Sequence, residues 1–151
     1  MKATVQPYRP MMASTAPGPF SDNDWLFEIK WDGVRAIATI DTTVSLRSRN
    51  NTEMAGQFPE LAELFGLAPG TVLDGEIVVM TGGKPDMQAL LPRLQEKSPG
   101  AGAVPVTYIV FDILRRGADD LTGLPLTERR KILLSAVRKK QKVFYNFSAA
   151  G

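Results

Sequence analysis

The stretch EIKWDGVRAI, residues 28–37, combines a reversal of the chain with residue types that carry chemistry. Apolar and polar residues alternate over positions 25–32, which is typical of a half-buried strand. Asp32-Gly33 is a turn signal, and Val34–Ile40 resumes as a second strand. The stretch therefore predicts a β-hairpin, with Glu28 and Lys30 on one strand face and aromatic residues facing a core on the other.

A lysine on this face has the chemistry of a nucleophile. Partial shielding from water would make Lys30 favour its neutral form more than a free lysine does, and a neutral amine attacks electrophiles. Arg35, on the return strand, presents a fork of donors that suits phosphate or ribose oxygens. The pattern K-x-D-G is short, so a hairpin with ordinary surface charges is the alternative interpretation.

The remaining pattern predicts an α+β fold with largely antiparallel sheet, because strands come first and helices are inserted between later strands. The proline-rich residues 1–21 are expected to form an irregular leader, and residues 22–151 the domain. Further strands are expected over residues 43–48, 72–80 and 106–114, with another starting at 143–147. Helices are expected over 59–65, over 86–97 (kinked or divided by Pro92) and after Pro125.

The composition excludes several kinds of site. The 151 residues contain no cysteine and no histidine, which excludes disulfides, thiolate nucleophiles, Ser-His-Asp machinery and histidine-based metal centres. An enzyme of this composition works with Lys, Asp, Glu, Arg and a hard metal ion. No apolar run approaches the ~20 residues of a membrane span, and no signal peptide is recognisable. A cytoplasmic location without membrane contact is expected.

Positive charge is unevenly distributed although the net charge is only +2. Runs at 115–116, 129–131 and 138–142 can meet phosphate, and a solvated helix face explains them equally well. In LRSRNNTE, Arg47, Arg49 and Asn50 can reach phosphate or sugar oxygens, and turn chemistry at Asn50-Asn51 is the alternative explanation of the asparagines.

Two further stretches carry candidate ligand contacts. In VLDGEIVVM, Asp74 and Glu76 fall on one strand face, where two carboxylates repel each other unless a cation or ribose hydroxyl satisfies them. Mg²⁺ bridged to a triphosphate would do so, and an edge strand with solvated acids is the alternative. In YIVFDIL, Phe111 shares a face with Ile109 and Ile113. Core packing is its default interpretation, and stacking on a nucleotide base is the alternative.

Taken in order, these stretches resemble the ATP-dependent DNA ligases of the covalent nucleotidyltransferase superfamily. EIKWDGVR resembles motif I (K-x-D-G-x-R), RSRN the arginine-containing segment after it, LDGEIVV motif III and YIVFDIL motif IIIa. RPMMAST resembles the start of bacterial and archaeal ligase domains, and LPLTERRKIL the helix after motif IIIa. The resemblance implies an ATP-grasp-like adenylation domain, with antiparallel sheets flanked by helices.

The resemblance also implies a role for each matching residue. Lys30 would attack the α-phosphate of ATP, expel pyrophosphate and hold AMP through a phosphoramidate bond. AMP would then pass to the 5′-phosphate of nicked double-stranded DNA. The other contacts would be Glu28 and Phe111 at the adenine, Arg35 and Arg49 at ribose and phosphate groups, and Glu76 at the ribose or at Mg²⁺.

The sequence departs from the family after motif IIIa. Motifs IV (E-G-x-x-x-K) and V (K-x-K), whose lysines stabilise the transferring phosphate, have no match, and neither has the oligonucleotide-binding domain that follows them. The chain is therefore expected to be part of an adenylation domain, incomplete at its C-terminus, that needs the missing portion as a partner to seal DNA. The alternatives are an RNA ligase or mRNA capping guanylyltransferase, and a non-catalytic nucleotide- or DNA-binding remnant.

Overall fold

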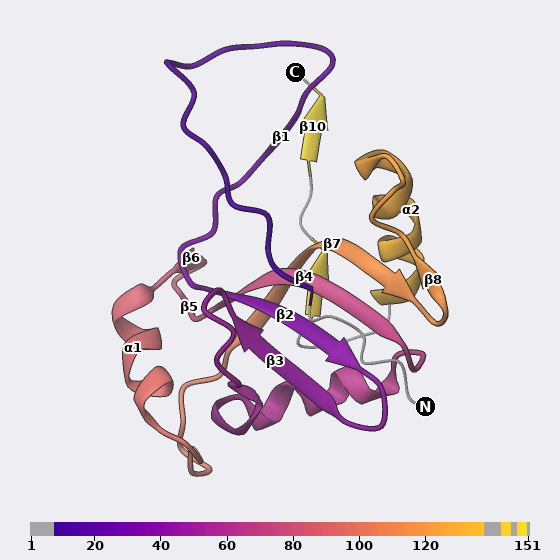
Figure 1. Ribbon diagram of the computed structural model, residues 1–151. Coiled ribbons are helices and arrows are strands. Elements are labelled where there is room, and N and C mark those ends of the chain that lie inside the picture. The colour runs from indigo at the N-terminus through magenta and orange to yellow at the C-terminus, as the bar shows by residue number, and fades with distance from the viewer. Residues whose placement is uncertain (1–7, 138–142, 146–147, 151) are drawn as a thin grey trace.

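The computed structural model describes residues 8–137, 143–145 and 148–150. A six-stranded sheet forms its centre, in the order β3-β2-β4-β7-β8, with β9 also paired to β7 (Figure 1). Every pair in this sheet is antiparallel except β7 with β9. The expected α+β fold with largely antiparallel sheet is confirmed. The strands are β2 (Val34–Ile40), β3 (Val44–Ser48), β4 (Thr71–Val78), β7 (Thr107–Arg116), β8 (Asp119–Asp120) and β9 (Val143–Tyr145).

The three expected helices are confirmed, with small differences at their ends, as the 3₁₀ helix η2 (Pro59–Gly66) and the α-helices α1 (Met87–Gln95) and α2 (Leu126–Val137). The short 3₁₀ helix η1 (Ala55–Gln57) was not predicted. Asp86 precedes α1 and caps it, because its carboxylate accepts a hydrogen bond from the Ala89 N–H at 3.0 Å. A small hairpin of β5 (Met80–Thr81) and β6 (Lys84–Pro85) turns at Gly82-Gly83, where both φ angles are positive.

One face of the sheet packs into the hydrophobic core. Alternation along β2 and β4 directs one set of side chains to η2, which lies beneath the sheet in Figure 1, while α2 flanks β7. Because the facing residues alternate, Arg35, Asp74 and Glu76 lie on the opposite face, which we call the polar face. The core residues include Ala36, Ala38, Ile40, Leu46, Phe58, Leu61, Leu64, Leu73, Ile77, Leu90, Tyr108, Val110 and Ile113.

The predicted hairpin at Asp32-Gly33 is wrong. Only Leu26–Glu28 forms a strand, β1, and it pairs with β10 (Ser148–Ala150) in a separate two-stranded sheet. β1 cannot join β2 because β3 and β4 already occupy both edges of β2. The expectation that the apolar side chains of residues 25–32 pack against a core is also wrong at two positions, because Trp25 and Ile29 are 57% and 62% exposed.

The ends of the chain are only partly described. Residues 8–21 contain no helix or strand, in agreement with an irregular leader, whereas the division of the chain at residue 22 stays a prediction. The strand expected to start at 143–147 is observed over Val143–Tyr145, and residues 146–147 lie outside the described part. The basic run at 138–142 also lies outside it. No helix in the described ranges has the length and apolar character needed to cross a membrane.

Candidate active site

Lys30 lies in a loop, residues 29–33, that joins β1 to β2. Gly33 anchors this loop to β4: a Cβ added there would lie 2.2 Å from the Ile77 carbonyl oxygen and 2.8 Å from Val78 Cγ1. Only glycine permits so close an approach of two backbones. Lys30 is exposed rather than partly shielded, which contradicts the expectation, because the residue is on a loop and not on a packed strand.

Glu76 lies beside this loop on the polar face. Glu76 on β4 is directly opposite Arg35 on β2 in the strand register, and it is half-buried. Burial raises the pKa of the Glu76 carboxyl above its ordinary value, and the positive charges of Arg35 and Lys30 oppose the rise without cancelling it. The strand register places Arg35 next to Glu76, and the contact of Gly33 with Ile77 brings the Lys30 loop to the same end of β4. An acid in such surroundings suits a ligand that brings hydroxyl groups or a cation.

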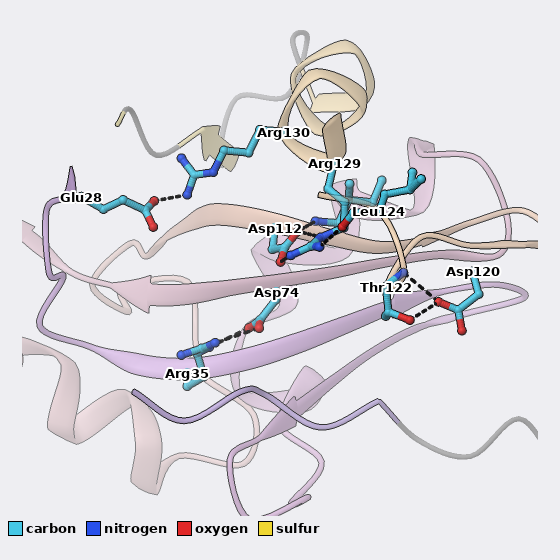
Figure 2. Close-up of polar contacts among 10 residues, drawn as sticks. Glu28, Arg35, Asp74, Asp112, Asp120, Thr122, Leu124, Arg129 and Arg130 are labelled. Atoms are coloured by element: carbon cyan, nitrogen blue, oxygen red, sulfur yellow. Dashed lines mark hydrogen bonds and ion pairs between the residues drawn. The ribbon is translucent and has the colours of Figure 1, made fainter. Parts of the chain in front are cut away.

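Arg35 and Asp74 form a bidentate ion pair across the same two strands (Figure 2). Arg35 Nε lies 2.6 Å from Asp74 Oδ1, and Nη2 lies 2.8 Å from Oδ2. The Asp74 carboxylate is almost fully buried; burial raises its pKa, and the hydrogen bonds from Arg35 oppose this rise. The fork expected to face ribose or phosphate is therefore directed at Asp74, which also shows that Asp74 is not a solvated acid on an edge strand.

Phe111 lies at a β-bulge, where the β4–β7 pairing shifts its register. The extra residue reverses the alternation, so Val110 and Ile113 both reach the core while Phe111 does not. The prediction that Phe111 shares a face with Ile113 is wrong, because two-residue periodicity fails at a bulge. The Phe111 ring instead lies under the Arg35 guanidinium, whose Cζ is 4.6 Å from the ring centroid. Its half-buried position leaves it available to an aromatic ligand.

The glycine in L-D-G-E has a comparable geometric cause. A Cβ on Gly75 would lie 2.5 Å from the Ile109 carbonyl oxygen and 2.6 Å from Tyr108 Cε2. The Tyr108 ring is fully buried, and its hydroxyl donates a hydrogen bond to the Ala36 carbonyl at 2.8 Å. The absence of a side chain at Gly75 therefore leaves room for the Tyr108 ring on the core side of β4, between the positions of Asp74 and Glu76.

Two arginines of α2, expected only as part of a basic run that can meet phosphate, contact the site. Arg130 forms an ion pair with Glu28 (Figure 2). Arg129 forms a bidentate pair with Asp112, with Nε to Oδ1 at 2.8 Å and Nη2 to Oδ2 at 2.7 Å. The sequence showed only a basic run, and nothing in its spacing identified acceptors on β1 and β7.

The remaining predicted contacts are less closely defined. Arg49 is exposed and follows Ser48, which pairs with Ala36, so it lies at the same end of the sheet as Arg35. Within the described residues, no cluster of three acidic groups is arranged to hold a metal ion. Glu76 as a Mg²⁺ ligand therefore stays a prediction. The polar face as a whole offers an exposed lysine, a half-buried acid, and an arginine stacked on an aromatic ring.

Comparison with known proteins gives this arrangement a family context. The family described as "ATP dependent DNA ligase domain" matches residues 10–149. The SPbeta prophage-derived DNA ligase-like protein LigB of Bacillus subtilis (strain 168) is 36% identical over an aligned length of 137, and the match covers 89% of this chain and 49% of the relative. DNA ligase C of Mycobacterium tuberculosis (strain ATCC 25618 / H37Rv) is 39% identical over an aligned length of 142, and the match covers 88% of this chain and 38% of the relative.

Solved structures agree with the sequence relatives. The ligase domain from M. tuberculosis LigD superposes with a TM-score of 0.68 and 28% identity, over 84% of this chain and 41% of that one. A mycobacterial DNA ligase D complexed with ATP and MES gives a TM-score of 0.65 and 29% identity over the same shares. The chain spans less than half the length of each of these four proteins.

Proposed function

Because this chain belongs to the ATP-dependent DNA ligase domain family, we propose that its polar face binds ATP and that Lys30 accepts AMP from it. The observation that carries the proposal is the meeting of the Lys30 loop, Glu76, Arg35 and Phe111 at one end of this face. These residues come from three separate motifs that lie apart in the sequence.

The proposed covalent step uses Lys30 as the nucleophile. The neutral amine attacks the α-phosphorus of ATP, a P–N bond forms, and the bond to pyrophosphate breaks with pyrophosphate taking the electron pair. The amine nitrogen loses one of its two protons, which passes to water. Gly33 supports this step indirectly, because its contact with Ile77 fixes the loop that carries Lys30.

The proposed base contacts involve Phe111 and Glu28. Adenine would stack on the face of the Phe111 ring that Arg35 leaves open, and stacking of a base on an aromatic ring is worth roughly 1–3 kcal/mol. Glu28 would meet the edge of the adenine while Arg130 holds its carboxylate in place. Glu76 and Arg49 would contact the ribose and phosphate groups, and Arg35, which is bound to Asp74, would add positive charge beside them.

Mg²⁺ fits this site as a partner of the triphosphate. Carboxylate and phosphate oxygens are the ligands it prefers, and it usually takes only one or two carboxylates from the protein. Glu76 is the residue that would hold it, and the ion would neutralise charge on the phosphates. The proposed acceptor of AMP from Lys30 is the 5′-phosphate of nicked double-stranded DNA. Binding of this DNA would also involve the part of the relatives that this chain does not span.

Lysyl-adenylation is tested by incubating the chain with α-³²P-ATP and Mg²⁺ and separating it on a denaturing gel. Label that survives denaturation, disappears in Lys30→Ala and persists in Lys84→Ala, an exposed lysine of β6, would support the proposal. Absence of label from the wild-type chain would contradict self-adenylation and favour a non-catalytic nucleotide-binding role. Preferential labelling by α-³²P-GTP would favour a guanylyltransferase.

A further inference from the structure

Four charged side chains form a row across the polar face. Arg35 on β2 holds Asp74 on β4, and Asp112 on β7 is held by Arg129 on α2 (Figure 2). Both pairs are bidentate, with all four N–O distances between 2.6 and 2.8 Å. The two acids are in the middle of the row and the two arginines are at its ends.

The two acids face each other directly. Asp74 and Asp112 are paired residues of neighbouring antiparallel strands, and the Cβ atoms of such pairs lie about 4.5–5.5 Å apart. Like charges at this spacing are destabilising. The pKa of Asp74 is raised first by burial, the hydrogen bonds and charge of Arg35 oppose the rise, and the charge of Asp112 adds to it.

Arg129 therefore affects more than its own partner. The Asp112 side chain is only 14% exposed. Without Arg129, its carboxylate would be a largely buried negative charge that has lost its cationic partner, which is destabilising. The Arg35 guanidinium lies on the other side of Asp74 and would be drawn towards both acids. Such a movement would alter its stacking on the Phe111 ring, because the same guanidinium makes the contact at 4.6 Å.

We propose that Arg129 is a positioning residue of the nucleotide site: by neutralising Asp112, it reserves Arg35 for Asp74 and keeps the guanidinium stacked on Phe111. The inference rests on the proposed function in that it makes α2 part of the ATP site. The competing explanation is that Arg129 has only a structural role: its pair with Asp112 attaches α2 to β7, and its hydrogen bond to the Leu124 carbonyl fixes the segment that precedes α2.

A double-mutant cycle separates the two explanations. The readout is the Nε–Hε signal of Arg35 in a ¹H–¹⁵N NMR spectrum of the whole chain, which reports the contact with Asp74 without any ligand. Arg129→Gln is expected to shift or broaden this signal, and adding Asp112→Asn is expected to restore it because the competing carboxylate is gone. Lys131→Gln, an exposed residue of the same helix, is expected to leave the signal unchanged.

If Arg129 only attaches α2 to β7 and has no electrostatic effect on Arg35, the expected result is different. Arg129→Gln and the double variant would then move the Arg35 signal equally, or neither would move it, and either outcome would overturn the proposal. If Arg129→Gln alone does not fold, Asp112→Asn is compared with the double variant. Loss of Arg129 should change nothing once Asp112 is neutral, and a large change would contradict the inference.

The link to the nucleotide is measured separately by calorimetric titration with ATP. Arg129→Gln is expected to weaken ATP binding about three- to tenfold, and the double variant to recover most of the loss, as expected for residues coupled through one network. Wild-type chain that binds no ATP would defeat the proposed function, while the NMR cycle would still decide whether Arg129 controls Arg35. Weaker ATP binding without recovery in the double variant would overturn the positioning role.

Discussion

Glu28 on β1 and Arg130 on α2 form an ion pair although 102 residues separate them in the sequence. The Arg130 side chain is 6% exposed and that of Glu28 is 30% exposed. The pair therefore ties the segment leading to Lys30 to a helix that packs against β7. A nucleotide that contacts Glu28 would therefore bind a carboxylate that Arg130 of α2 already orients.

Arg130→Gln is expected to lower the free energy of unfolding by roughly 1–3 kcal/mol, since removing one partner of a largely buried pair leaves the other charge poorly compensated. Urea unfolding followed by circular dichroism measures the change. The matched control is Lys131→Gln, whose pair with Glu128 is 72% and 50% exposed; we expect less than about 0.5 kcal/mol there. Similar losses in both variants would show that the burial of the Arg130 pair has no energetic importance.

Gly33→Ala is expected to lower the free energy of unfolding by about 2–3 kcal/mol, because the new methyl group overlaps the Ile77 carbonyl and the two backbones must separate. The same variant should lose lysyl-adenylation, since the loop that carries Lys30 would shift. Gly102→Ala is the control, as a Cβ there meets nothing within 4 Å. An unchanged urea midpoint for Gly33→Ala would refute the close contact.

Glu76→Gln is expected to stabilise the chain at neutral pH while removing nucleotide binding. The pKa of Glu76 is raised in the folded state by burial, so the folded chain takes up the proton more readily than the unfolded one. The resulting penalty is present above the folded pKa and disappears as the pH falls towards the unfolded value of 4.5. The stability difference between Glu76→Gln and wild type should therefore shrink on acidification. A difference that grows instead would mean that the pKa is lowered.

Glu60→Gln is expected to cost roughly 3 kcal/mol, because Arg93 is 3% exposed and would keep its charge without its carboxylate partner. Arg93 Nη1 lies 2.8 Å from Glu60 Oε1, and Nη2 donates to the Gln57 carbonyl at 2.7 Å. Urea unfolding at pH 7 measures the loss, with the exposed Glu96→Gln as control.

The pH dependence gives a second check on the Glu60 pair. Burial acts to raise the pKa of Glu60, but the hydrogen bonds from Arg93 and from backbone groups outweigh it and hold the pKa below 4.5. A lowered pKa contributes stability that is complete above the unfolded value and is lost as the pH falls through the folded one. The wild-type chain should thus lose its advantage over Glu60→Gln below about pH 4.5. An advantage that persists at lower pH would argue against the ion pair.

Local patterns were sufficient for most of the elements. Alternation identified β2, β3, β4 and the main strand β7 to within two residues at each end, and Pro125 marked the start of α2. These features depend on short-range backbone preferences and on which side chains face a core, both of which are read within a few residues. The motif order also identified the family, because K-x-D-G, L-D-G-E and the later motif occur in the required sequence.

The structure corrected expectations that depended on partners distant in the chain. Alternation over 25–32 predicted a strand but could not show that both edges of β2 are filled, which sends β1 to β10 instead. Likewise, period-two reasoning placed Phe111 with Ile113, whereas a bulge created by the β4–β7 pairing places it against Arg35.

The sequence by itself therefore determined the chemistry of this chain: a lysine beside an aspartate and a glycine, without cysteine or histidine, in the motif order of a ligase family. Only the tertiary structure decided which charges meet, pairing Arg35 with Asp74, Arg129 with Asp112 and Arg130 with Glu28. The physical reason is that an ion pair forms between side chains that are close in space, whatever their separation in the sequence. The sheet register and the packing of α2 decide which side chains are close, and no local pattern of residues shows this.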